Sequence, residues 1–310
     1  MRIWSPHVES SSHAVIMCWS PIKSLLISGD TMFSSHQDCK IRVWHLNESC
    51  RLRAVLPTAR DRILSLLSPT KFVQVRRHKK CTWVQHVDAV SALAISGDGS
   101  LLYSVSWDRT IKIWRSSDYK CSESIPRAHD DAINAIMVSK DGFVYTGSAD
   151  KTIKVWKKHP GQKKHSLVDT LERHRSAVNA LALSGDESVL YSGACDRSVV
   201  VWEGRDGRRW EAVGALRGHT GAVLCLSVSG ELVCSGSADR TVRAWRRLGG
   251  QSGGYSCLAV FEGHGGPVKS LAMVAGGAET SSEQDNTWLV YSGSLDCDIK
   301  LWKLLVPFFT

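Results

Sequence analysis

The sequence of 310 residues predicts an all-β fold of repeated four-stranded units, a β-propeller, because several features recur together along it. Six short apolar alternating runs end in a tryptophan, at intervals that in the middle of the chain match the roughly 40 to 45 residues of a propeller blade. An Asp stands six residues before each of these tryptophans, and a Ser or Thr stands four residues before each Asp. The recurring tryptophans are Trp44, Trp114, Trp156, Trp202, Trp245 and Trp302.

The unit that begins near His86 shows how one repeat divides into strands. Apolar or alternating segments at 90–95, 101–106, 110–114 and 121–125 predict four short strands, and the Gly-Asp-Gly sequence at 97–99 predicts the first turn. No helical period of similar strength occurs in these units, which argues against the helical repeat families of similar length. Each repeat therefore predicts one blade.

Composition excludes several other classes of protein. Apolar residues make up 43% of the chain, but no uninterrupted apolar run approaches the roughly 20 residues of a membrane helix, and residues 1–12 lack the apolar stretch of a signal peptide. We therefore expect a soluble protein of the cytoplasm and/or nucleus. The ten cysteines include no C-x-x-C pair, so we expect buried free thiols, with no disulfide framework, no metal and no cofactor.

Two Gly-His dipeptides, Gly218-His219 and Gly263-His264, are followed by S-G-S-x-D and by an aliphatic-x-aliphatic-Trp run. In these motifs nearly the whole chain resembles WD repeats. It is also similar to plant WD-repeat proteins of the JINGUBANG type, through His36-Gln37-Asp38, the basic run 76–80 and the segment 128–134. The resemblance implies a propeller of seven blades that acts as a protein-interaction scaffold.

Ser or Thr, His and Asp are also the ingredients of a catalytic triad, but a triad occurs once in a cleft, whereas this set recurs with a Trp in each unit. The resemblance implies instead a buried hydrogen-bond chain in each blade, from the Trp indole through the hydroxyl and the imidazole to the Asp carboxylate. We therefore expect no catalytic residue and no enzyme. The network residues expected are His86, Ser104, Asp108, Trp114, His129, Thr146, Asp150, Trp156, His174, Ser192, Asp196, Trp202, His219, Ser235, Asp239, Trp245, His264, Ser292, Asp296 and Trp302.

The pattern fails at the start of the chain. Cys18 falls where the other repeats have the His, so we expect the first blade to have an incomplete network and to be the weakest. Arg2-Ile3-Trp4 looks like the end of a third strand, which predicts a blade without its first two strands. Either the chain is a truncated form, which we favour, or something outside it covers the exposed edge. We expect one domain, residues 1–310, with a basic insertion at 51–80 and a flexible loop at 275–287.

The formal charge of +9 is concentrated in one segment, because residues 51–80 contain nine Lys or Arg and one Asp. Within it, residues 60–67 predict about two turns of amphipathic helix before Pro69. Nucleic-acid binding through this insertion is one alternative function, and Arg76, Arg77, Lys79 and Lys80 equally suit a nuclear-import signal or an acidic protein partner.

The leading expectation is a scaffold that binds protein partners through its loops, without a membrane or a small-molecule substrate. Trp107 is the only aromatic residue at its position among the six repeats, and Trp is enriched among binding hot spots. Asp88, Asp130, Asp131 and Arg175 follow the repeat histidines and are further candidate contacts. A second alternative is a substrate receptor of a cullin-type ubiquitin ligase, because Trp202-Glu203-Gly204-Arg205 is similar to a W-D-x-R box.

Overall fold

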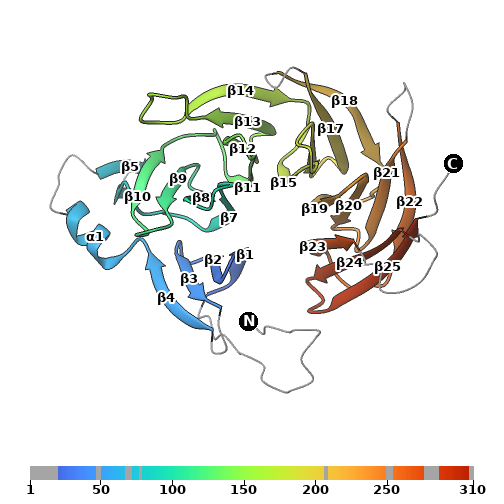
Figure 1. Cartoon of the computed structure of the whole chain (residues 1–310), viewed down its shortest axis with the longest axis horizontal. Coiled ribbons are helices and arrows are strands. Elements are labelled where there is room, and N and C mark those ends of the chain that lie inside the picture. The colour runs from blue at the N-terminus through green and yellow to red at the C-terminus, as the bar shows by residue number, and fades with distance from the viewer. Residues whose placement is uncertain are drawn as a thin grey trace. The chain divides into compact units, whose positions relative to one another are not determined.

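The computed structural model describes residues 20–46, 50–66, 72–76, 79–205, 209–248, 254–275 and 286–306. These residues form five four-stranded antiparallel sheets, a three-stranded sheet, a two-stranded hairpin and a single helix. The prediction of an all-β propeller fold is confirmed, and each of the first five sheets is one blade with its strands paired in chain order (Figure 1). Cys18 and the segment 2–4 lie outside the described residues.

The strands begin and end close to the predicted limits. The first sheet holds β1 (Ile22–Ser28), β2 (Thr31–His36), β3 (Ile41–His45) and β4 (Arg51–Leu56), and the second holds β7 (Val90–Ile95), β8 (Leu101–Ser106), β9 (Ile111–Arg115) and β10 (Cys121–Ile125). The third holds β11 (Ile133–Val138), β12 (Phe143–Ser148), β13 (Thr152–Lys157) and β14 (Ser166–Glu172). The fourth holds β15 (Val178–Leu183), β16 (Val189–Ala194), β17 (Ser198–Arg205) and β18 (Arg209–Arg217). The fifth holds β19 (Val223–Ser229), β20 (Leu232–Ser237), β21 (Val242–Arg247) and β22 (Tyr255–Phe261), and the last holds β23 (Val268–Ala275), β24 (Asn286–Ser294) and β25 (Ile299–Val306).

The chain divides into two compact units, residues 1–144 with 157–166, and residues 145–156 with 167–310. The expectation of a single domain stays a prediction. In the first unit, apolar side chains of the first sheet pack against Val90, Leu93 and Trp114 of the second. In the second unit, similar clusters join the fourth sheet to the fifth and the fifth to the last. Each sheet therefore buries a face against its neighbour, which is why its strands are apolar.

Glycine at one repeated position lets neighbouring sheets of the second unit approach closely. A Cβ added at Gly147, Gly193 or Gly236 would lie 2.6 to 2.8 Å from a side-chain atom of the first residue of the next sheet. These residues are Val178, Val223 and Val268, respectively. These distances are shorter than any ordinary carbon contact. Packing between neighbouring sheets therefore requires glycine at these three positions, whereas a Cβ at Gly293 of the last sheet would meet only an ordinary contact of 3.7 Å.

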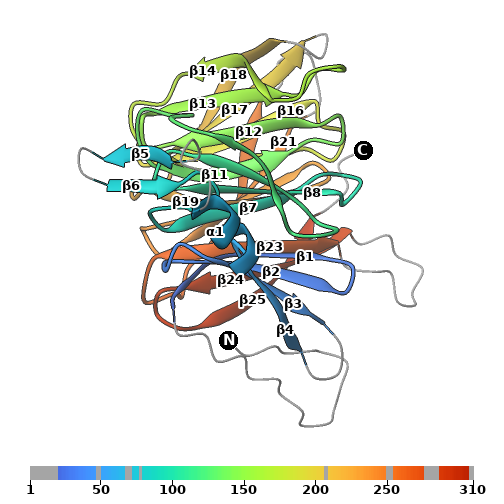
Figure 2. The same ribbon diagram turned by 90° about the vertical axis from the view of Figure 1, so that its left-hand side faces the viewer.

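The basic insertion differs from its predicted limits. Residues Arg51–Leu56 are the fourth strand of the first sheet, so the inserted segment begins only after β4. Helix α1 (Ala59–Leu66) confirms the predicted helix, and Thr58 caps it by accepting a hydrogen bond from the Asp61 amide at 3.2 Å. The hairpin of β5 (Phe72–Arg76) and β6 (Lys79–Thr82) follows, and both lie at the periphery of the first unit with α1 (Figure 2).

Two other expectations need correction. Of the eight cysteines found as free thiols in the described chain, only Cys225 and Cys234 are buried, and Cys195, Cys257 and Cys297 are exposed. Hydrophobicity of the residue type did not determine burial here, because these exposed cysteines lie in turns or on an outer strand. The predicted loop at 275–287 is also shorter, since Ala275 ends β23 and Asn286 begins β24, while residues 276–285 lie outside the described chain.

Candidate functional site

The second sheet shows the complete hydrogen-bond network of one blade. The Trp114 indole donates to Ser104 Oγ at 2.9 Å, and Ser104 Oγ lies 2.8 Å from His86 Nε2. His86 Nδ1 lies 3.1 Å from an Asp108 carboxylate oxygen, which also accepts from the Val87 amide at 2.8 Å. Strand pairing explains the geometry, because β8 and β9 place Ser104 and Trp114 on one face and the following turn returns Asp108 to His86.

The same arrangement recurs in three further sheets. The distances from His Nε2 to the hydroxyl are 2.7 to 2.8 Å, those from His Nδ1 to the carboxylate are 2.8 to 2.9 Å, and the indoles donate at 2.8 to 2.9 Å. These sets are His174, Ser192, Asp196 and Trp202; His219, Ser235, Asp239 and Trp245; and His264, Ser292, Asp296 and Trp302. In the third sheet Trp156 donates to Thr146 at 3.0 Å, Thr152 donates to Asp150 at 2.7 Å, and His129 is buried.

Electrostatics favour a neutral imidazole in the networks of the second and fifth sheets. Burial lowers the pKa of His86 and of His219 below the ordinary value, in each case against the opposing attraction of the Asp. Burial alone would raise the pKa of Asp108, but the interaction with His86 and the hydrogen bonds from Thr110 and Val87 lower it overall. A neutral His that donates from Nδ1 to Asp and accepts at Nε2 from the Ser hydroxyl leaves every group in the chain with a partner.

This arrangement cannot supply a nucleophile. The hydroxyls of Ser104, Ser192, Ser235 and Ser292 are all fully buried, so no substrate reaches them. Each already accepts from an indole and is bonded to an imidazole. The Ser, His and Asp residues therefore form a buried structural hydrogen-bond network within each blade.

One member of the network is missing from the sequence-based set. A Ser or Thr two residues after the Asp donates its hydroxyl to the second carboxylate oxygen at 2.6 to 2.7 Å. Thr110, Thr152, Ser198 and Thr241 hold this position, and their repeated spacing from the Asp is the signal that would have identified them.

The first sheet obtains its imidazole from a position that the sequence did not predict. His36 is fully buried, and its Nε2 lies 2.8 Å from Ser34 Oγ, which accepts from the Trp44 indole at 2.7 Å. Asp38 instead binds Arg42 through two hydrogen bonds of 2.6 and 3.2 Å. His36 thus supplies the imidazole expected to be missing, but its Nδ1 lies 3.2 Å from the Ser20 carbonyl, and Asp38 binds Arg42. The network of the first sheet is therefore incomplete, as predicted, at its link from His to Asp, and the prediction that this blade is the weakest stays a prediction. His36 takes the place that Ser106, Ser148, Ser237 and Ser294 hold two residues before the Asp of other repeats.

Trp107 lies in a hollow of about 220 Å³ that also has Asp88, Asp130 and Asp131 in its lining. The side chain is 39% exposed, and the Lys23 ammonium lies 4.8 Å from the centroid of its ring. Asp88 and Asp131 each accept a hydrogen bond from the next amide along the chain, which holds both carboxylates in place. Four of the predicted contact residues thus lie together.

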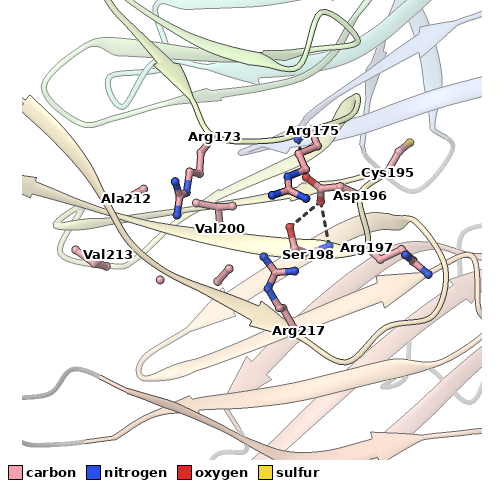
Figure 3. Close-up of a pocket in the computed structure, with 12 residues that line it drawn as sticks. Arg173, Arg175, Cys195, Asp196, Arg197, Ser198, Val200, Ala212, Val213 and Arg217 are labelled. Atoms are coloured by element: carbon pink, nitrogen blue, oxygen red, sulfur yellow. Dashed lines mark hydrogen bonds between the residues drawn. The ribbon is translucent and has the colours of Figure 1, made fainter.

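Arg175 lies elsewhere, in a second hollow of about 500 Å³ in the fourth sheet (Figure 3). Arg76, Lys79 and Lys80 lie on β5 and β6, and Arg77 lies outside the described residues. Arg53 of β4 stacks on Tyr119 at 5.7 Å, so the basic segment is divided among a strand, a helix and a hairpin. The interpretation that it binds nucleic acid stays a prediction.

The residues similar to a W-D-x-R box lie within a strand. Trp202 is buried and donates to Ser192, and Glu203 pairs with Arg247 at 2.6 Å. Both side chains are thus engaged within the chain, and no described contact favours the ligase-receptor interpretation.

Comparisons with known proteins agree with this architecture. Autophagy-related protein 16 of Arabidopsis thaliana is 27% identical over 69% of this chain and 45% of its own length, and human Transducin beta-like protein 3 is 27% identical over 92% and 32%. The chain thus spans less than half the length of these curated relatives. The designed Ika8 protein has a TM-score of 0.63 at 27% identity, covering 94% of this chain and 74% of the other, and U3-55K has 0.66 at 24%, covering 93% and 79%.

The WD domain, G-beta repeat family matches residues 78–115, 120–157, 165–203, 210–246 and 255–303. These five matches cover most of the described sheets after the first, and each contains the Trp of one network. The chain therefore belongs to the WD40 repeat family.

Proposed function

We propose that this chain is a non-catalytic scaffold or adaptor that presents the turns of its blades to protein partners in a regulatory or signalling complex. WD40 propellers typically act as protein-interaction scaffolds and bind proteins. We also propose that the chain is related to the JINGUBANG-type plant proteins and that it acts in the cytoplasm or nucleus. No helix in the described part of the chain is long and apolar enough to cross a membrane.

The exposure of Trp107 in its acidic hollow carries the proposal. A large aromatic ring at a turn, with no need to fill the core, loses little conformational entropy on binding and offers a large contact area. Asp88, Asp130 and Asp131 outnumber Arg109 in the lining, so the hollow carries net negative charge, which favours a partner segment with Lys or Arg beside an apolar anchor. The contact with Lys23 shows that a cation fits against this ring.

Affinity purification with mass spectrometry tests the proposal. Trp107→Ala should deplete specific partners, because loss of a hot-spot side chain costs about 2 kcal/mol or more of binding free energy. Leu258→Ala is the matched control, since Leu258 is an apolar side chain of similar exposure, 37%, on β22. Recovery of the same proteins at the same level with Trp107→Ala as with wild type would refute the assignment of this surface, provided that both variants melt like wild type.

A further inference from the structure

The fourth sheet departs from the other repeats at two positions, Val200 and Arg173, and both line one hollow together with Arg217. The residue two places before the network Trp is Lys or Arg in five repeats but Val200 in the fourth. Arg173 stands before the network His, where the fifth and last repeats have the Gly of Gly-His. Arg217 ends β18, two residues before His219, where Glu172 and Glu262 precede two other histidines and Arg127 precedes a third. Arg173, Val200 and Arg217 all line this hollow.

The short side chain of Val200 opens the hollow. In the second sheet, the buried Lys112 at the equivalent position donates to the Trp83 carbonyl and, at 2.9 Å, to Ser124 Oγ of the outer strand. In the fourth sheet, Val200 faces Ala215 at the same register position, so both the ammonium and the hydroxyl are absent. The space that a basic side chain fills in the second sheet is therefore open, with a volume of about 500 Å³.

Exposed guanidinium groups surround this space. Arg173 and Arg175 approach it from one side, and Arg217 approaches from the other, while Arg197 lies beyond Asp196 at the rim (Figure 3). None of the four guanidinium groups forms an ion pair or a hydrogen bond within the described chain. A cluster of four positive charges with a single carboxylate among them favours binding of an anion.

Asp196 offsets only one of the four positive charges. One of its carboxylate oxygens lies 2.9 Å from His174 Nδ1 and 3.0 Å from the Arg175 amide, and the other accepts from Ser198 through the hydroxyl at 2.6 Å and the amide at 3.1 Å. Burial alone would raise the pKa of Asp196, but these hydrogen bonds lower it to about 2. Four arginines thus face a single carboxylate whose oxygens are already engaged, and the hollow is strongly positive.

The wall of the hollow is an unpaired strand edge. β18 is the last strand of its sheet, pairing with β17 alone, and its segment 212–215 is exposed and built of small residues, Ala-Val-Gly-Ala. A Cβ added at Gly214 would meet no atom within 4 Å, so another backbone can approach there. A neighbouring hollow shares Arg173 and Ala212 with this one, and its lining includes Arg209 and Trp210 but also Asp169 and Glu172. An extended peptide can pair with such an edge on either side of the bulge at Val213, whereas a nucleic acid or a free polyphosphate has no peptide backbone to extend the sheet.

We propose that this groove binds an extended, phosphorylated peptide segment, whose backbone pairs with the edge of β18 and whose phosphate lies among Arg173, Arg175 and Arg217. Guanidinium groups bind phosphate through paired, charge-assisted hydrogen bonds, and a phosphoryl group carries about −1.5 to −2 charge at neutral pH. This site is separate from the Trp107 surface and does not depend on it.

Fluorescence anisotropy with a labelled peptide pool tests the proposal. The pool carries a fixed central phosphothreonine and degenerate flanks, and matched pools carry Thr or Glu at that position. We expect the phosphorylated pool to bind at least about tenfold more tightly than the Thr pool, with the Glu pool between them. The double variant Arg173→Gln/Arg217→Gln should lose about tenfold or more of this affinity. Arg240→Gln, which removes an exposed turn arginine of the fifth sheet, should leave it unchanged.

The variant Val200→Lys distinguishes binding inside the hollow from non-specific attraction to positive charge. It adds a positive charge yet fills the space, so binding should weaken as much as in the double arginine variant, and five other repeats already accept Lys or Arg there. Unaltered binding by Val200→Lys, or no preference for the phosphorylated pool, would overturn the proposal. It would equally be overturned if inositol hexakisphosphate or single-stranded DNA bound with the same dependence on Arg173 and Arg217 while the peptide pools did not. Trp107→Ala should change none of these results.

Discussion

Replacing His36 by Ser tests whether this residue takes over the imidazole role in the first sheet. Ser holds this position in four other repeats, and substitution toward the commonest residue usually stabilises a protein. Here the structure predicts the opposite. His36 is fully buried, and its removal leaves the buried hydroxyl of Ser34 with only a long contact of 3.5 Å to the Arg42 carbonyl besides the Trp44 indole.

The magnitude follows from these contacts. An unsatisfied buried hydroxyl costs about 1 to 3 kcal/mol, and the void left by the imidazole adds about 1 kcal/mol. The contact from His36 Nδ1 to the Ser20 carbonyl adds little, because Ser20 is only partly buried and water can replace the ring. We therefore expect His36→Ser to lower the local free energy of unfolding by about 2 to 4 kcal/mol.

Hydrogen exchange measured by mass spectrometry on peptides from β2 and β3 reports this local stability, and a thermal melt reports the global effect. His45→Ser is the control, because His45 lies on the same sheet but is exposed, and its loss should change stability by less than about 0.5 kcal/mol. Exchange in β2 and β3 that is the same for His36→Ser, His45→Ser and wild type would refute the role assigned to His36.

Two further predictions concern stability. The pKa values of the buried His36, His86 and His219 are lowered from the ordinary 6.5, so the unfolded chain binds protons that the folded chain does not as the pH falls below about 6.5. The urea midpoint of unfolding should therefore be highest above about pH 6.5 and should decrease as the pH falls below this value. A further decrease is expected below about pH 4, where carboxylates with lowered pKa values, such as Asp196, become protonated. A midpoint that is higher at pH 5.5 than at pH 7.5 would contradict the neutral imidazoles. Gly193→Ala should destabilise the second unit by about 1 to 3 kcal/mol, because the new Cβ would lie 2.6 Å from Val223, whereas Gly185→Ala meets no atom within 4 Å; equal melting temperatures for both variants would count against close packing at Gly193.

The sequence by itself determined the repeat, the strands and most members of the networks. These features depend on neighbours within one blade, and antiparallel pairing of short strands places such neighbours at fixed spacings. Ser104 and Trp114, for example, come together because β8 pairs with β9 in a register that their spacing already implies. Trp107 could likewise be identified from the sequence, since none of the other five repeats has an aromatic residue at the equivalent turn position.

Only the tertiary structure decided which departures from the repeat matter. It showed that His36 reaches Ser34 from an unexpected position, that three aspartates surround Trp107, and that Val200 opens a space lined by arginines. Each depends on where a side chain points and on what a neighbouring strand or loop leaves unfilled, and spacing along one repeat does not contain that information. The β-propeller follows from what its blades share, whereas the arginine-lined hollow follows from the register that sets Val200 opposite Ala215 between Arg173 and Arg217.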